Sequence, residues 1–101
     1  MSTKYDGIQS LEKRFGKMTL GMFIRSLREA DGISQTAFAE KLGISRANLC
    51  DIEKGRKPVS INRAAKLAKK LQIATKVFVQ LAIQDEIRQA KLPLKVEVKV
   101  A

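Results

Sequence analysis

The sequence predicts an all-α fold of five helices, preceded by an arm with a short helix and followed by one β-strand. Three observations carry this prediction. Apolar residues recur at spacings of three and four over most of the chain, which places them on one side of a helix. Glycine or proline follows most of these stretches, and both residues end helices. Only residues 94–100 alternate strictly between apolar and polar, as a half-buried strand does.

Length and composition indicate a single globular domain. The chain has 101 residues, of which 45% are hydrophobic, and this suffices for one modest core. We divide it into an arm with a short helix (residues 1–18), a central helical domain (residues 19–73) and a C-terminal helix and strand (residues 74–101). The short helix of the arm is expected over residues 10–15.

The helices on either side of the centre follow from their apolar stripes. The first full helix is expected over residues 19–31, where Gly21 weakens the first turn by about 1 kcal/mol and so predicts close packing against a neighbour. A fourth helix is expected over residues 61–71 and a fifth, capped by Thr75, over residues 76–90. The buried stripe of the fourth is expected to comprise Ile61, Ala64, Ala65, Ala68 and Leu71. That of the fifth is expected to comprise Val77, Phe78, Leu81, Ala82 and Ile87.

The stretch between these helices, residues 34–58, carries the functional interpretation. Ser34 and Ser45 are placed to cap two short helices by accepting from amides of the first turns. Gly43, between them, can take the left-handed conformation of a tight turn. The inner faces of the two helices comprise Phe38, Ala39, Leu42, Leu49 and Ile52. Two short helices joined in this way form a helix-turn-helix, whose second helix lies in the major groove of DNA.

The charge of the chain agrees with a polyanionic partner. It contains 20 Lys+Arg and 10 Asp+Glu, which gives a net charge of +10. Each phosphate that such a protein neutralises releases counterions and thereby favours binding. A basic surface in contact with solvent alone, or with an acidic protein, would give the same count. Charge and helix-turn-helix pattern together favour nucleic acid.

Several functional classes lack the residues that they need. The chain has no histidine, and Cys50 is its only cysteine, which excludes internal disulfides, cysteine–histidine metal sites and a histidine base. We find no nucleophile–base pair and no phosphate-binding loop, so we expect neither enzymatic activity nor a cofactor. An apolar signal core and an apolar run of membrane-spanning length are also missing, so we expect a cytoplasmic protein without a membrane partner.

The residues SQxxxAxxLGIS…LxxIExGRxxP, read from Ser34 onward, resemble the helix-turn-helix family of phage repressors, Cro-type regulators and related antitoxins, also called XRE-like or Cro/C1-type. The resemblance covers residues 19–71, about half of the chain, and implies a lambda-repressor-like DNA-binding domain. By this resemblance the base-contacting residues are Arg46, Ala47, Asn48, Cys50 and Asp51. The phosphate-binding residues that it implies are Ser34, Gln35, Ser45, Lys54, Arg56 and Lys57.

The side chains of the second helix suggest how DNA would be recognised. The planar fork of Arg46 can donate twice to guanine, which discriminates between bases by about 1–3 kcal/mol. Asn48 could bind adenine or a phosphate, and Ala47 could contact a thymine methyl group or simply leave space. Cys50 is more often a filler of a half-exposed position than a base contact.

Two acidic residues in the same region have alternative roles. Asp51 could accept from cytosine, or it could pair with Arg46 or Lys54 and orient them. Glu53 interrupts the basic pattern, and we expect its carboxylate to form a cap or to bridge to an arginine such as Arg28 or Arg56. Because family members often have amide side chains where this chain has Arg46, Ala47 and Asp51, its operator should differ from theirs.

The C-terminal segment is a predicted interface. The apolar arc of the fifth helix is wider than one core contact requires, since Val79 and Ile83 lie off its main stripe. The strand over residues 94–100 could pair with its copy across a two-fold axis, with residues 3–7, or with another protein, or it could remain a free tail. The interface is expected to comprise Val79, Ile83, Ile87, Leu94, Val96, Val98 and Val100.

These patterns predict a sequence-specific protein that binds double-stranded DNA and regulates transcription. The first interpretation is a repressor that binds a near-palindromic operator as a homodimer, with the helix over residues 45–54 in the major groove. The alternative is an antitoxin that binds a protein toxin through the C-terminal segment and autoregulates its operon.

Overall fold

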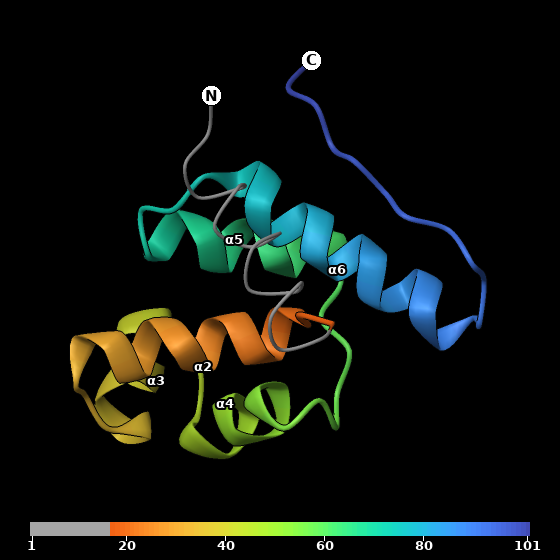
Figure 1. Cartoon of the computed structure of the whole chain (residues 1–101). Helices are drawn as coiled ribbons and strands as arrows, with labels where there is room; N and C mark the ends of the chain where they lie inside the picture. The colour runs from red at the N-terminus through yellow and green to blue at the C-terminus, as the bar shows by residue number, and fades with distance from the viewer. Residues whose placement is uncertain (1–16) are drawn as a thin grey trace.

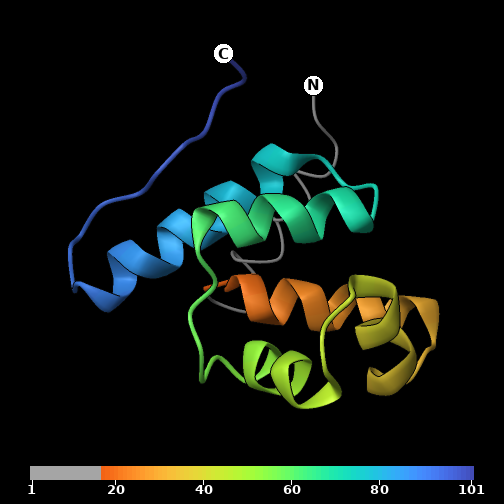
Figure 2. The ribbon, with the colours of Figure 1, turned by 180° about the vertical axis from the view of Figure 1, so that it is seen from behind.

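The computed structural model describes residues 17–101 and has five α-helices in that range. They are α2 (Leu20–Asp31), α3 (Gln35–Leu42), α4 (Arg46–Glu53), α5 (Ile61–Lys70) and α6 (Thr75–Gln89). Helices α2, α3 and α4 form one group, while α5 packs along α6, which also contacts α2 (Figure 1 and Figure 2). The predicted five-helix, all-α architecture is therefore confirmed; the predicted arm helix over residues 10–15 lies outside the described residues.

The core lies where the two groups of helices meet. Its largest fully buried side chains are Phe38, Phe78, Leu20, Ile24, Leu42, Leu49 and Ile52. Phe23 of α2 meets Phe78 of α6 edge-on, with ring centroids 5.9 Å apart. The buried residues predicted for α3 and α4 are all in this core, so the helix-turn-helix is attached to the rest of the molecule by its apolar faces.

Serine and threonine hydroxyls cap four of the five helices. The predicted caps are confirmed: Ser34 accepts from the amide of Ala37 at 3.1 Å, and Ser45 accepts from the amide of Asn48 at 3.0 Å. Thr19 and Ser60 cap α2 and α5 in the same way. The predicted cap Thr75 is wrong, because Thr75 is itself the first residue of α6 and no side chain caps that helix.

The buried side of α5 is rotated from the predicted stripe. Ala64 and Ala68 are buried as expected, but Ile61 is 46% exposed and Leu67 is buried in its place. Both sets of residues fit a spacing of three and four, so the apolar pattern alone allowed either rotation. Packing against α6 selects the one that buries Leu67.

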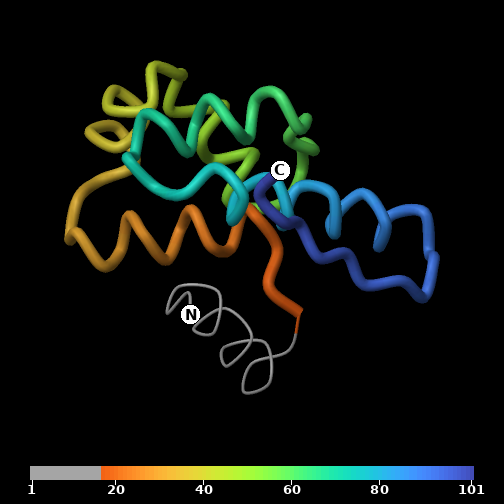
Figure 3. Tube along the Cα trace, turned by 90° about the horizontal axis from the view of Figure 1, so that it is seen from above, coloured from red at the N-terminus to blue at the C-terminus, as the bar shows by residue number. Residues whose placement is uncertain are grey.

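The predicted strand over residues 94–100 does not form. The tail turns back after α6 and runs extended beside it (Figure 3). Gln84 donates from Nε2 to the carbonyl of Leu94 at 2.8 Å and accepts from the amide of Val96 at 2.8 Å, while Gln80 accepts from the amide of Val98 at 3.0 Å. A strand requires a neighbouring backbone, and within residues 17–101 side-chain amides occupy that place.

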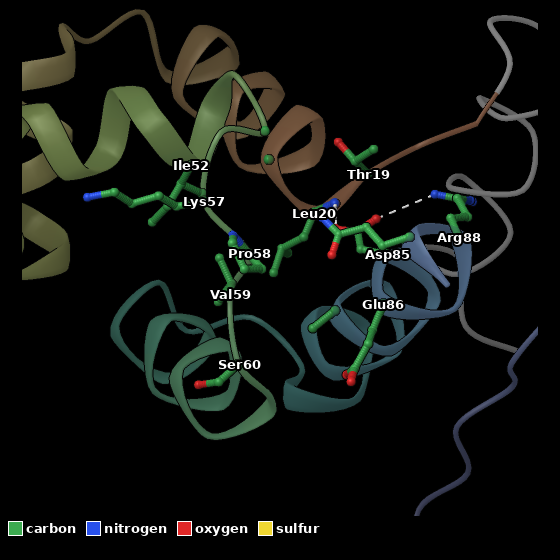
Figure 4. Close-up of a pocket in the computed structure, with 14 residues that line it drawn as sticks. Thr19, Leu20, Ile52, Lys57, Pro58, Val59, Ser60, Asp85, Glu86 and Arg88 are labelled. Atoms are coloured by element: carbon green, nitrogen blue, oxygen red, sulfur yellow. Dashed lines mark hydrogen bonds and ion pairs between the residues drawn. The ribbon is translucent and has the colours of Figure 1, made fainter. Parts of the chain in front are cut away.

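Helix α6 also fixes the start of α2. The carboxylate of Asp85 accepts from the amide of Leu20 at 3.0 Å, and Arg88 donates to the carbonyl of Met18 at 3.0 Å. Between these residues and the loop after α4 is a largely apolar cavity of about 520 Å³ (Figure 4). The first turn of α2 is thus held against α6 on one side while it approaches α4 on the other.

The crossing of α2 and α4 depends on Gly21. A Cβ atom built on this residue would overlap the carbonyl oxygen of Ile52 and crowd that of Glu53. The prediction of close packing at Gly21 is therefore confirmed, and any larger residue would push the first turn of α2 away from the end of α4.

We predict that Gly21→Ala lowers the free energy of unfolding by about 1–3 kcal/mol, because the added methyl group meets backbone atoms that cannot rotate away. At an unobstructed helical position the same change would stabilise by about 1 kcal/mol, so the sign of the effect is diagnostic. Urea denaturation measures it, with Met22→Ala at the exposed neighbouring residue as the control. An unchanged or higher stability would contradict this view of the crossing.

Candidate nucleic-acid interface

Helix α4 lies at the edge of the molecule away from α5 and α6, packed on α2 and α3 (Figure 1). Gly43, with a φ of 71°, makes the predicted left-handed turn between α3 and α4. Leu49 and Ile52 are buried on the inner side of α4. The first turn therefore presents Arg46 and Ala47, both exposed, to the outside.

The buried carboxylate of Glu53 connects all three helices of this unit. One oxygen accepts from Nε of Arg28 at 2.8 Å, and the other accepts from Nη2 of Arg28 and from the amide of Gln35, each at 3.1 Å. Arg28 belongs to α2, Gln35 to α3 and Glu53 to α4. Arg28 also donates to the carbonyl of Ile33 at 3.1 Å, just before α3. Of the arginines expected to bridge to Glu53, the structure selects Arg28.

The Glu53–Arg28 pair changes the pKa of both groups. Burial acts to raise the pKa of Glu53, but hydrogen bonds from Arg28 and Gln35 and the positive charge of Arg28 outweigh it, so the pKa lies below its ordinary value. The hydrogen bond with Glu53 raises the pKa of Arg28 in turn. Both groups are therefore charged at neutral pH, with only 2% of the Glu53 side chain exposed.

Asp51 pairs with residues other than the two considered from the sequence. Its carboxylate oxygens lie 3.6 Å from Nη1 of Arg56 and 3.5 Å from Nζ of Lys57, whereas Arg46 and Lys54 were the expected alternatives. The cause is the turn at Gly55, whose φ of 72° folds the chain back so that the amide of Arg56 bonds to the carbonyl of Asp51 at 2.9 Å. Both cations are exposed, so these pairs add little stability but hold the positive charges next to α4.

The remaining predicted base-contacting residues are less exposed than Arg46 and Ala47. Asn48 and Cys50 are half-buried. The amide oxygen of Asn48 is shielded from solvent and has no hydrogen-bond partner among the described residues. Arg46, in contrast, forms no ion pair with any residue in the range 17–101 and extends from the exposed side of α4.

The predicted phosphate-binding residues fall into two groups. Ser34, Gln35 and Ser45 lie at the N-termini of α3 and α4, where the serine hydroxyls are engaged as caps and Gln35 donates one amide hydrogen to Glu53. Lys54, Arg56 and Lys57 are exposed on the loop after α4. Helix N-termini with unbonded amides and a loop of cations are both suited to phosphate oxygens.

Sequence reasoning missed the position of Lys70. Its ammonium group lies over Gly43, where a Cβ atom on the glycine would collide with it. A cation at this place offsets the negative end of α3, which terminates at Leu42. The two residues are far apart in the sequence, and only the packing of α5 on α3 brings them together, so no local pattern could have indicated the contact.

Comparison with protein families decides what this arrangement is. The family model for the helix-turn-helix of Cro/C1-type, XRE-like proteins matches residues 24–78, more than half of the 101 residues. The chain belongs to this helix-turn-helix family. The family consists of DNA-binding transcription regulators and is not a catalytic one. No protein with a curated description and no solved structure gives a significant match to the chain. Among the described helices, none has the length and apolar character to cross a membrane.

We predict that Glu53→Gln lowers the free energy of unfolding at neutral pH by about 3 kcal/mol, because it leaves the charge of Arg28 without its partner in a largely buried position. Glu29→Gln is the matched control. It removes the same charge from a pair with Arg25 in which both side chains are 56% exposed, and should cost at most about 0.5 kcal/mol. Equal effects of the two substitutions would contradict the role of Glu53.

The same pair predicts a pH dependence. Because folding lowers the pKa of Glu53, its contribution to stability is complete above the ordinary pKa of about 4.5 and is lost as the pH falls through the lower pKa of the folded state. The stability difference between wild type and Glu53→Gln should therefore shrink in acid. Denaturation at several pH values below 5 measures this; a difference independent of pH would contradict it.

Proposed function

We propose that the protein is a transcriptional repressor that binds a near-palindromic operator in double-stranded DNA as a homodimer, with α4 of each subunit in the major groove. The observation that carries the proposal is the exposed first turn of α4, which projects Arg46 from a helix fixed at its other end by Glu53. The net charge of +10 supports an anionic partner.

We assign base recognition to the outer side of α4. Arg46 would donate to guanine, and Ala47 next to it would admit a thymine methyl group. Asn48 and Cys50 are half-buried and would contribute only where the DNA approaches closely. For Asp51, the pairs with Arg56 and Lys57 favour an orienting role over direct contact with cytosine.

We assign phosphate binding to the two sides of α4. Ser34, Gln35 and Ser45 would place one strand of the DNA against the N-termini of α3 and α4. On the other side, Lys54, Arg56 and Lys57 would contact a second stretch of backbone, and the Asp51 carboxylate would hold two of these cations in position before DNA binds. These contacts fix the orientation of Arg46 relative to the bases.

The alternative function, an antitoxin that also regulates its operon, rests on the C-terminal segment. Leu94 is 56% exposed and Val100 is 81% exposed on an extended tail, which a partner protein could cover. In this division of the chain, residues 19–73 would bind DNA and residues 74–101 would bind a second copy or a toxin, with Val79, Ile83 and Ile87 supporting the tail.

The direct test is selection of binding sites from a library of random double-stranded DNA. We expect enrichment of one sequence with two inverted half-sites about one helical turn apart. Binding of two chains to each enriched site, measured by mass, would support the homodimer. Failure to enrich any sequence would contradict the proposal, and a single unrepeated half-site would contradict the near-palindromic operator.

We predict that Arg46→Ala reduces affinity for the selected site by about 1–3 kcal/mol, with the loss of discrimination confined to one base pair in each half-site. Binding to unrelated DNA should remain nearly unchanged. Fluorescence anisotropy with a set of single-substitution operators measures both quantities.

The control for this prediction is Lys57→Ala, which removes a charge from the loop and not from the outer side of α4. It should weaken binding to all sequences alike and lower the slope of log affinity against log salt by about 1. If Arg46→Ala gave this second pattern, Arg46 would be a phosphate contact and not a base contact.

A further inference from the structure

The extended tail is bonded to the rest of the molecule along only one of its edges. Its three hydrogen bonds to α6 all use backbone groups of even-numbered residues: Leu94, Val96 and Val98. In an extended chain, the N–H and C=O groups of successive residues point to opposite edges. The backbone groups of Lys95, Glu97 and Lys99 therefore point away from α6.

This second edge is open. Lys95, Glu97 and Lys99 are exposed, and their backbone groups form no hydrogen bond with other residues in the range 17–101. Seen from above, the tail has α6 on one side and no other described segment on its outer side (Figure 3). An extended segment with unpaired backbone groups is a template for a further strand.

The tail is also prepared for such pairing before a partner arrives. Gln80 and Gln84 hold it extended, so less conformational freedom would be lost on binding. Val96 and Val98 are half-buried. A ribbon of two strands is marginal in water by itself, but here the helix beneath would support it.

We propose that the open edge of the tail pairs with the same edge of a second copy of this chain, antiparallel and with Val96 on the two-fold axis. The proposal names the interface of the homodimer put forward above and rests on that part of the proposed function. It does not depend on DNA binding.

Charge decides between the alternative registers. Centred on Val96, the pairing places Lys95 opposite the partner's Glu97 and Glu97 opposite the partner's Lys95, which makes two favourable pairs. A register shifted to centre on Glu97 would place that carboxylate against its own copy and Lys95 against the partner's Lys99. Like charges directly opposite one another are destabilising, so that register is excluded.

Apolar contacts favour the same register over the next one. Centred on Val98, the pairing would also oppose Glu97 and Lys99, but it would leave Leu94 without an apolar residue opposite. Centred on Val96, it brings Leu94 against the partner's Val98 on the apolar side of the ribbon. Leu94 is 56% exposed in the single chain and would be covered in this way.

The limits of the ladder agree with the sequence. In this register Pro93 lies opposite the partner's Lys99, where the proline carbonyl can accept but no proline N–H is available to donate. Proline is tolerated at the first position of a strand and ends the hydrogen-bonded ladder there. The ribbon would thus run from Pro93 to Lys99 in each chain.

The test uses two substitutions that each invert one charge, Lys95→Glu and Glu97→Lys, in the full chain without DNA. Each variant alone opposes like charges at both pairs, so its homodimer dissociation constant should rise roughly tenfold. Mixed together, the two variants should form a heterodimer of near wild-type affinity, because each Glu then faces a Lys. Sedimentation equilibrium at low salt measures all three.

Lys99→Glu is the matched control, since it changes the net charge by the same amount as Lys95→Glu but faces a proline in this register. Its dissociation constant should remain at the wild-type value. Weakening by Lys99→Glu without weakening by Lys95→Glu would overturn the register in favour of the one centred on Val98. Circular dichroism of each variant verifies that the helices are intact.

Other outcomes would overturn the interface itself. A wild-type chain that is monomeric, or a dimer indifferent to all three substitutions, would mean that the tail pairs with something else, such as residues 3–7 or a different protein. Because no DNA is present, these results are independent of whether α4 recognises an operator, which the selection experiment decides separately.

Discussion

The carboxylate of Glu53 sets the geometry of the DNA-binding unit. A charge so far from water is costly unless its lone pairs are satisfied, and here Arg28 and Gln35 supply charged and neutral donors from two other helices. This arrangement fixes α4 at its last residue. The first turn of α4, which carries Arg46, is left without any structural duty and is thereby available for binding.

The same requirement explains the close crossing of α2 and α4. Gly21 and Arg28 are seven residues apart and so share one face of α2. Gly21 lets the backbone of α2 come down onto the carbonyl of Ile52, and two turns later Arg28 reaches the carboxylate of Glu53. A small residue and a long one on a single face thus determine both the distance and the rotation between the helices. Helix α6 secures the start of α2 through Asp85.

The features that the sequence predicted well are those with local causes. The caps at Ser34 and Ser45, the turn at Gly43 and the close approach at Gly21 each follow from the chemistry of one residue and its neighbours. The match to the helix-turn-helix family confirms the fold that these residues indicated. The roles of individual residues in binding DNA remain predictions.

What the sequence could not give depends on contacts between distant segments. The rotation of α5 was ambiguous because two sets of residues have helical spacing, and only α6 distinguishes them. The partners of Asp51 depend on how the chain folds back after Gly55. The expected strand failed because a period of two specifies an extended chain and not what lies beside it.

The way in which α6 holds the tail has a geometric limit. Gln80 and Gln84 are one helical turn apart, about 6.0 Å along the axis, while the backbone groups that they bind repeat every second residue, about 6.6 Å along an extended chain. The two repeats nearly coincide, so a helix with amides every four residues can act as a ruler for an extended segment. The small mismatch accumulates with each turn. The next positions in the series are Lys76 and Arg88, which cannot accept from a backbone amide, so the ruler has only two marks.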